Sequence, residues 1–427
     1  MKVGHLWPRL LIPQARPRQW VPTLRVLCEE WARCRMQSGF DAAEISWYKQ
    51  HRTRSWNERK SRVPTVMFDK MHSSPRARVQ AFVSRLGIRL PILLAPMAGA
   101  CPPSLSIAVA NAGGLGACAA LLMEPDDIAA WAAEFRQASQ GEFQINLWIP
   151  EPPPFRDSEL ETRQREFLAQ WGPTVPPEAG DAALPDFAAQ CHAMLTVSPR
   201  VISSIMGLYP PAFVSELKAR GILWFATATT VAEAKAAEKA GADAIVAQGM
   251  EAGGHRGTFN ADDAEFQMVG LMALLPQIVD AVNLPVVAAG GIADARAIAA
   301  ALILGASAVN IGTGFLRSPE AKTHPAYVDR LARTEADDTR ITRAFSGRPG
   351  RSVATTYVRA ATAPTAPRPA PYPVQRGLTR AMRDAALRAG DPDRMQMWAG
   401  QSAKLARAQP AGTLAQQLWE DASRLLV

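Results

Sequence analysis

Cysteine and histidine are scarce in this 427-residue chain, which contains five and six of them. The cysteines form no CxxC pair and their number is odd, which indicates neither a disulfide framework nor a zinc site. Cys101 has no neighbouring group in the sequence that would activate its thiol, so we interpret it as a small apolar filler. No run of about 18 uncharged apolar residues is present, so no membrane span is predicted. A cytoplasmic protein without a bound metal fits these absences best.

The net charge of +8 is concentrated at the start of the chain. Residues 1–70 contain 14 lysines and arginines against 6 aspartates and glutamates, so the remaining residues sum to about zero. This distribution argues against a nucleic-acid partner, because the folded part of the chain is not basic. A basic RNA-binding protein remains an alternative that depends on residues 1–70 alone.

Residues 1–75 differ in composition from the rest and are set apart from the fold. They hold five of the eleven tryptophans and show no sustained helical or strand period. Three interpretations stay open. They are an upstream extension with translation starting near Met67 or Met71, a disordered basic arm, and an organelle transit peptide, which the acidic residues disfavour.

From residue 85 onwards, short apolar runs alternate with alanine-rich helical stretches. Eight runs predict strands over residues 91–98, 114–120, 143–149, 201–207, 223–229, 244–249, 286–291 and 308–315. Apolar runs without alternation are typical of strands buried on both faces of a parallel sheet. Eight β-then-α units predict an α/β fold, a (β/α)8 TIM barrel over residues 80–320, with a doubly wound sheet as the alternative.

Capping residues mark two of the helices. Thr230 and Glu233 form a capping box at the start of a helix over residues 231–240. Asp294 is placed to cap a helix over residues 295–304. These signals support the order of strand and helix that a barrel requires.

Two segments interrupt the alternation. Residues 150 to about 200 are proline-rich and predict a lid or an extra helix beside the barrel mouth. Residues 321–427 follow the eighth strand and predict a smaller additional lobe, closed by a helix at about 413–426. Within it, residues 360–367 are alanine- and proline-rich, so we expect no regular secondary structure there.

Glycines collect after the last two predicted strands, at the end where such a barrel binds ligands. These loops contain Gly290, Gly291, Gly312 and Thr313. Glycine lets backbone N–H groups approach an anion, so the loops predict a phosphate-bearing ligand, while a plain turn is the alternative for each pair. The nearest cation is Arg317, which either neutralises the phosphate or caps a helix.

His255 is the candidate catalytic residue. It lies after the sixth strand between Gly254 and Gly257, and it is the one histidine of six at a predicted barrel mouth. Histidine can accept a proton near neutral pH, whereas a hydrogen-bonded structural histidine is the alternative. We expect Glu251, in the same loop, to position the loop and not to act as a second base.

From about Leu90 to Leu418, the chain resembles the nitronate monooxygenase family, formerly called 2-nitropropane dioxygenases. The resemblance rests on LPILLAPMAG at 90–99, ANAGGLG at 110–116, AQGMEAGGHRG at 247–257, PVVAAGGI at 285–292, GTGFL at 312–316, FSGRP at 345–349 and WAGQ at 398–401. It implies FMN as cofactor and oxidative denitrification of alkyl nitronates or nitroalkanes by dioxygen to carbonyl compounds and nitrite. It assigns His255 as the base that takes the α-proton of a nitroalkane or contacts the nitronate.

The resemblance also implies which residues line the FMN site. They are Ala95, Pro96, Met97, Asn146, Thr227, Gln248, Gly254, Ala289, Gly290, Gly291, Gly312 and Thr313. The family often has Gly-Thr-Arg-Phe after the eighth strand, but this chain has Gly314 in place of the arginine, so a charge near the phosphate is missing. An NAD(P)H-dependent quinone reductase, an enoyl-acyl-carrier-protein reductase and a non-catalytic flavin-binding protein remain alternatives. The sequence indicates no oligomeric state.

Overall fold

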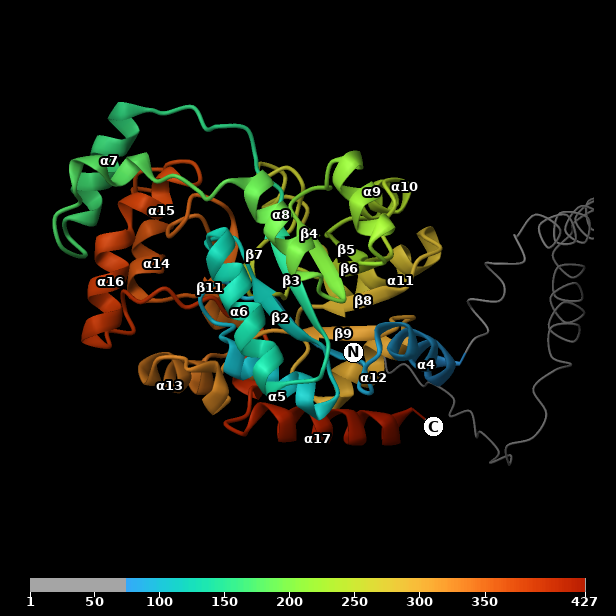
Figure 1. Cartoon of the computed structure of the whole chain (residues 1–427). Helices are drawn as coiled ribbons and strands as arrows, with labels where there is room; N and C mark the ends of the chain where they lie inside the picture. Colours follow the sequence, from blue (N-terminus) through green and yellow to red (C-terminus); the bar gives the residue numbers. More distant parts are fainter. Residues whose placement is uncertain (1–73, 427) are drawn as a thin grey trace, which may run out of the picture. The chain divides into compact units, whose positions relative to one another are not determined.

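The computed structural model describes residues 74–426 of the chain (Figure 1). The interpretations of residues 1–75 therefore lie almost wholly outside the described residues. No helix in residues 74–426 is long and apolar enough to cross a membrane.

Eight parallel strands form one sheet in the order β1-β9-β8-β6-β5-β4-β3-β2. The strands are β1 Ile92–Leu94, β2 Gly116–Ala119, β3 Phe143–Trp148, β4 Val201–Ile205, β5 Leu223–Ala228, β6 Ala244–Gln248, β8 Val286–Ala289 and β9 Ala308–Ile311. A parallel bridge between Leu93 and Leu115 brings the two ends of this order together. The sheet is therefore a nearly closed barrel, which confirms the predicted (β/α)8 fold.

Each strand lies within its predicted range, but each ends earlier than predicted. After β4 and β8 the reason is local, because the backbone leaves the extended conformation there. At Met206, Gly290 and Gly291 the φ angles are +68°, +106° and +70°, which a strand cannot accommodate. The apolar runs therefore predicted the strands, and the residues beyond their ends form the loops of the mouth.

Helices surround the strands (Figure 1). The barrel helices and the two helices packed with them are α4 Pro75–Leu86, α5 Pro103–Ala112, α6 Pro125–Ala138, α8 Phe187–Val197, α9 Pro211–Ala219, α10 Val231–Lys239, α11 Leu271–Ala281, α12 Ala295–Ile303 and α17 Ala411–Leu425. Helix α17 packs against α5 and α12, and its Leu414 and Leu418 are buried there. The predicted closing helix thus completes the barrel's outer layer.

Both predicted helix caps are present. Thr230 Oγ1 accepts from the N–H of Glu233 at 3.1 Å, and the Glu233 carboxylate accepts from the N–H of Thr230 at 3.2 Å. Asp294 Oδ1 accepts from the N–H of Ala297 at 3.0 Å. These bonds satisfy N–H groups that a helix start leaves without an intrahelical partner.

The segment after β9 contains helices and a small sheet. Its elements are η2 Thr313–Phe315, η3 Pro319–Ala321, α13 Pro325–Arg333, η4 Ala336–Asp338, β10 Thr339–Thr342, β11 Gly350–Val353, α14 Thr356–Ala361, α15 Val374–Leu378, α16 Arg380–Ala389 and η5 Ala403–Leu405. Because α14 continues through Ala360 and Ala361, the prediction of no regular structure over residues 360–367 is wrong for these two alanines. Alanine favours helix, and the helix stops before Pro364.

The insertion between β3 and β4 supplies α7 Ser158–Leu168 and η1 Pro177–Asp181 in addition to the barrel helix α8. Helix α7 lies beside α14, α15 and α16 (Figure 1). Its Leu168 is buried in one apolar cluster with Tyr357 and Leu378 from the segment after β9. The predicted extra helix is thus present, while a domain boundary at residues 320–321 stays a prediction.

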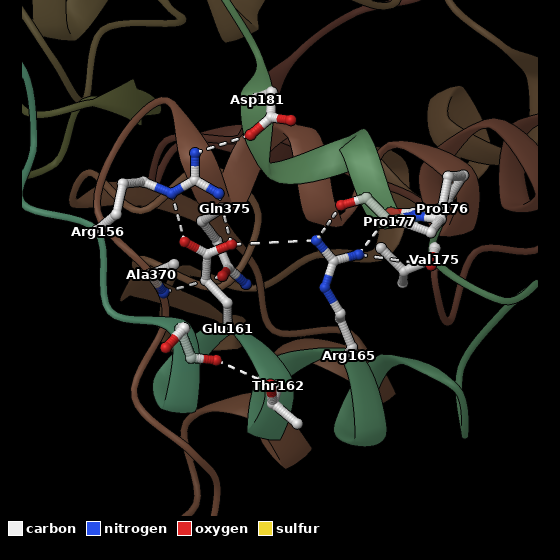
Figure 2. Close-up of polar contacts among 11 residues, drawn as sticks. Arg156, Glu161, Thr162, Arg165, Val175, Pro176, Pro177, Asp181, Ala370 and Gln375 are labelled. Atoms are coloured by element: carbon white, nitrogen blue, oxygen red, sulfur yellow. Dashed lines mark hydrogen bonds and ion pairs between the residues drawn. The ribbon is translucent and has the colours of Figure 1, made fainter.

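Polar contacts hold this insertion in place (Figure 2). The buried carboxylate of Glu161 accepts hydrogen bonds from Nε and Nη2 of Arg156. Nη1 of Arg156 donates to Asp181 Oδ1 at 3.0 Å. Gln164 lies in α7, as Glu161 does, and its Oε1 accepts a hydrogen bond from Gln375 Nε2 of α15 at 3.1 Å. Hydrogen bonds therefore connect residues within the insertion, and one connects the insertion to α15.

Candidate functional site

The loop that carries His255 is held by its backbone on two sides. Residues Gly254–His255 form β7, which pairs antiparallel with β11, with Gly350 opposite His255. At the end of β6, Gln248 Nε2 donates to the carbonyl of His255 at 3.2 Å, and its Oε1 accepts from the N–H of Gly257 at 2.8 Å. The loop after β6 is therefore anchored both to the barrel and to the small sheet.

Glu233 provides a third anchor that the sequence analysis did not assign to the site. Its Oε2 accepts from the N–H and the hydroxyl of Thr229, at 2.6 and 2.8 Å. Its Oε1 accepts from the N–H of Phe259 at 2.7 Å. The capping box was the available signal, but it did not reveal that the same carboxylate also reaches the end of the His255 loop.

The His255 imidazole is half-buried among aromatic rings and a serine. Its Nε2 lies 2.8 Å from the hydroxyl oxygen of Ser346. The Trp148 ring lies edge-on at 4.7 Å between centroids, and the Trp398 ring lies at 4.6 Å. Tyr372 extends this aromatic wall, 5.4 Å from Trp148. Neither tryptophan nor Ser346 was predicted as a site residue, although segments 345–349 and 398–401 carried the family resemblance.

The surroundings of His255 disfavour its protonated form. Burial, and then the positive charges of Arg348 and Arg376, lower the pKa of His255 to about 3. Arg348 is itself buried, where it meets the carboxylate of Glu151 and donates to the carbonyl of Thr258 at 2.7 Å. His255 is thus a neutral imidazole at pH 7, which is the form that can accept a proton.

Eleven of the twelve residues predicted to line the cofactor lie near or just beyond the carboxyl ends of barrel strands, and Gly254 lies in the loop after β6. Ala95, Pro96 and Met97 follow β1, Asn146 lies in β3, Thr227 in β5 and Gln248 in β6, Gly254 starts β7, Ala289 ends β8, Gly290 and Gly291 follow it, and Gly312 and Thr313 follow β9. Carboxyl ends of parallel strands meet at one end of a barrel, so the fold brings these residues together.

The glycines after β8 and β9 lie in loops at the mouth of the barrel. Gly290 and Gly291 both have positive φ angles, and consecutive backbone amides of this kind can form an anion-binding concavity. A Cβ atom on Gly312 would lie 3.3 Å from Met97 Sδ, so a side chain would crowd the first strand's loop. At Gly254, φ is +76° and a Cβ would meet no atom within 4 Å, so open space lies beside His255. The backbone of Gly290 and Gly291 is therefore compatible with a phosphate-bearing ligand.

The departure at Gly314 has a steric reason. A Cβ atom there would lie 2.8 Å from Ile311 Cγ2, too close for any side chain without movement. Arg317 Nη1 donates to the carbonyl of Ala406 at 2.7 Å, so the protein engages part of this guanidinium group, and its role towards a phosphate stays a prediction. Thr313 is also engaged, since its Oγ1 accepts from the N–H of Gly400 at 3.0 Å.

Glu251 and Cys101 both form hydrogen bonds with the backbone. Glu251 accepts from the N–H of Leu271, at 2.9 and 3.0 Å, where α11 begins. Cys101 is buried and donates to the carbonyl of Ala117 at 3.2 Å, and burial raises the pKa of its thiol to about 12. Residues 74–426 contain no group of three or more His, Cys, Asp or Glu side chains that could hold a metal ion.

Comparison with known proteins agrees with this arrangement. A family model described as nitronate monooxygenase matches residues 80–421. A protein of Staphylococcus aureus (strain Newman) named "Probable nitronate monooxygenase" is 36% identical over 332 residues, 77% of this chain and 93% of that protein.

Two solved structures extend the likeness to the fold. Nitroalkane oxidase from Streptomyces ansochromogenes matches with a TM-score of 0.72 and 36% identity, covering 79% of this chain and 97% of its own. FabK from Thermotoga maritima matches with a TM-score of 0.61 and 28% identity, covering 81% and 96%. The family and the first of these structures indicate oxidation of nitroalkanes or nitronates as the class of reaction. The chain therefore belongs to the nitronate monooxygenase family of oxidoreductase enzymes.

Proposed function

We propose that this protein is an FMN-dependent enzyme that oxidises alkyl nitronates, and nitroalkanes after deprotonation, to carbonyl compounds and nitrite with dioxygen. The observation that carries the proposal is the position of His255. It is a neutral imidazole at the barrel mouth, beside open space and beside glycine loops suited to a phosphate. A base next to a bound redox cofactor is the arrangement that this reaction needs.

In this proposal, two groups of residues hold FMN. The backbone of Gly290, Gly291, Gly312 and Thr313 would hold the phosphate. The ring system would lie against Ala95, Pro96, Met97, Asn146, Thr227, Gln248, Gly254 and Ala289. When bound, FMN supplies the electron acceptor and the reaction with dioxygen, which no side chain can provide.

His255 would perform the proton transfer. The C–H bond next to the nitro group breaks, the proton passes to the imidazole, and the electron pair stays on the substrate as its nitronate. Arg376 and Arg348, the latter paired with Glu151, are close enough to act on His255, and their positive charges favour this anion over the neutral nitroalkane. Trp148 and Trp398 flank the imidazole, with ring centroids 4.7 and 4.6 Å from it.

A reductase that takes hydride from NAD(P)H and acts on a quinone or an enoyl-acyl carrier protein is the second candidate. The observation in its favour is the match to FabK, at 28% identity. It is supported less well than the nitronate reaction, because the nitroalkane oxidase matches at 36% identity and with a higher TM-score.

Small-molecule substrate and dioxygen are the partners in this proposal, with neither nucleic acid nor membrane. A cytoplasmic location is part of it, since Cys101, Cys118 and Cys191 are free thiols buried in the described structure.

The visible spectrum of the purified protein tests the proposal. We expect a flavin spectrum, release of FMN on denaturation, and anaerobic bleaching of the flavin by propyl-nitronate but not by NADH. Rapid bleaching by NADH alone would favour the reductase. A colourless protein that FMN cannot reconstitute would contradict both.

A further inference from the structure

Ser346 is the side chain that contacts the imidazole of His255 through a hydrogen bond. It lies in the loop between β10 and β11, only 2% exposed, with its Oγ 2.8 Å from His255 Nε2. Two more hydrogen bonds reach the same oxygen, since Oγ lies 3.1 Å from the carbonyl oxygen of Arg348 and 3.3 Å from the N–H of Arg348. The Ser346 hydroxyl therefore has three partners.

A serine hydroxyl has one proton to donate and can accept two hydrogen bonds. The carbonyl of Arg348 can only accept, and its N–H can only donate. All three contacts are satisfied together when Ser346 donates to the Arg348 carbonyl and accepts from both its N–H and His255 Nε2. If Ser346 instead donated to Nε2, the carbonyl would lose its bond to this hydroxyl in a buried loop. The local bonding therefore assigns the proton of the neutral imidazole to Nε2.

The surrounding structure keeps the Ser346 loop in place. Thr379 donates to the carbonyl of Phe345 at 2.7 Å. Gly347 has a φ angle of +89°, and a Cβ there would lie 2.3 Å from the carbonyl oxygen of Ala370. Arg348 is fastened to Glu151 and Thr258. The hydroxyl is thus presented to the imidazole by a loop with little freedom to move.

The other imidazole nitrogen, Nδ1, makes no hydrogen bond to any residue between 74 and 426. Since the imidazole is half-buried next to the open space at Gly254, its remaining lone pair is available to a ligand. The two nitrogens therefore have different surroundings, one engaged by protein and one free.

We infer that Ser346 is a positioning residue that holds His255 in the tautomer with its proton on Nε2, so that Nδ1 accepts the α-proton of the substrate. When Nδ1 takes the proton, the C–H electron pair stays on the nitronate, and Nε2 still donates to Ser346. The hydrogen bond is therefore kept in both protonation states, and neither side chain has to rotate during the transfer. This inference rests on the proposed base role of His255.

The tautomer can be measured without turnover. In full-length protein labelled with ¹⁵N-histidine, the long-range ¹⁵N–¹H spectrum near pH 7 distinguishes a protonated ring nitrogen from an unprotonated one, and His255→Asn identifies the signals. We expect a protonated Nε2 and an unprotonated Nδ1 for His255. In Ser346→Ala the signals should move towards a mixture of tautomers, and Ser346→Thr, which keeps the hydroxyl, should restore them. A proton on Nδ1 in the unsubstituted protein would overturn the inference.

Kinetics provide the second arm. Ser346→Ala should lower kcat/KM for neutral nitroethane by roughly 10- to 100-fold, while kcat/KM for preformed ethyl nitronate changes less than about threefold. Ser352→Ala is the matched control, because Ser352 is also buried and donates to a carbonyl, that of Met397 at 2.8 Å, without touching His255. Equal losses on both substrates, or equal effects of the two serine variants, would contradict the positioning role. Failure of the proposed function is distinct, since it would abolish nitronate turnover and leave the tautomer measurable.

Discussion

At the scale of single residues, the sequence was sufficient to place His255 at the barrel mouth but not to predict which side chains contact it. His255 stood out because histidine is scarce and because glycines flank it after an apolar run. Ser346 and Trp398 lie 91 and more residues further along the chain, and only the fold brings them to the imidazole. Their type alone, a serine and a tryptophan, predicts nothing about which histidine they contact.

Arg376 offers a test of the electrostatics at this scale. Its charge lowers the pKa of His255, so Arg376→Gln should raise that pKa, although burial remains the larger cause. A base works only when unprotonated. The acid limb of kcat/KM for a neutral nitroalkane should therefore move to higher pH, by up to about one unit. A pH–rate profile measures this.

Arg380→Gln is the control for this profile. Arg380 follows one turn later, is exposed, and pairs with Asp384 at 3.7 Å. Its removal should leave the limb where it is. A shift to lower pH in Arg376→Gln would show that the charge of Arg376 does not act on His255.

At the scale of elements, glycine loops and side-chain contacts within a helix start were predictable, whereas side-chain contacts between elements were not. The positive φ angles at Gly290 and Gly291 confirm a backbone that needs glycine, while the phosphate stays a prediction. In contrast, Glu233 was predicted only as a helix cap, because its bond to Phe259 depends on how two loops pack. The sequence also predicted a longer β1 than the three residues observed, because apolar residues continue past Leu94.

Gly290→Ala should weaken flavin binding. At a φ of +106°, a Cβ would be strained and would lie 3.0 Å from the N–H nitrogen of Ala252. We expect the dissociation constant for FMN, measured by flavin fluorescence quenching, to rise about tenfold or more, with about 1 kcal/mol lost from the free energy of unfolding. Gly221→Ala is the matched control, because Gly221 has a φ of +68° and no atom within 4 Å of a Cβ. Similar FMN binding by both variants would argue against a cofactor role for the loop.

Glu233→Gln should destabilise the protein without direct contact with the substrate. The buried carboxylate accepts four hydrogen bonds, and an amide would place a donor against some of those N–H groups. We expect the free energy of unfolding, from urea denaturation, to fall by about 2–3 kcal/mol. The exposed Glu216, paired with Arg220 at 3.4 Å, should tolerate the same change with a loss under about 0.5 kcal/mol. Comparable losses in the two variants would contradict the anchoring role.

At the scale of the whole molecule, the barrel was predictable and the packing of its additions was not. The barrel arises from a local repeat of apolar run and helix, which the sequence displays directly. The insertion reaches its partners across long sequence separations, as Gln164 and Gln375 are 211 positions apart. Composition indicates that such a segment is an addition to the barrel. Which surface the segment covers depends on shape complementarity, which composition does not show.

Gly377→Ala tests that packing. A Cβ at Gly377 would lie 1.9 Å from the carbonyl oxygen of Ala179 in η1, so the insertion or α15 must move. Because Arg376 lies in the same short helix, we expect both a lower Tm, by several degrees, and a changed acid limb of the pH–rate profile. A variant with unchanged Tm and unchanged profile would show that the close contact is not required.

The most direct test of the whole account is the substrate dependence of His255→Asn. We would measure kcat/KM for neutral nitroethane and for preformed ethyl nitronate at one pH, with FMN bound. If His255 is the base, the value for nitroethane should fall about 100-fold or more, while the value for the nitronate, which needs no deprotonation, should fall less than about tenfold. An equal loss on both substrates would contradict the assignment of His255 as the base.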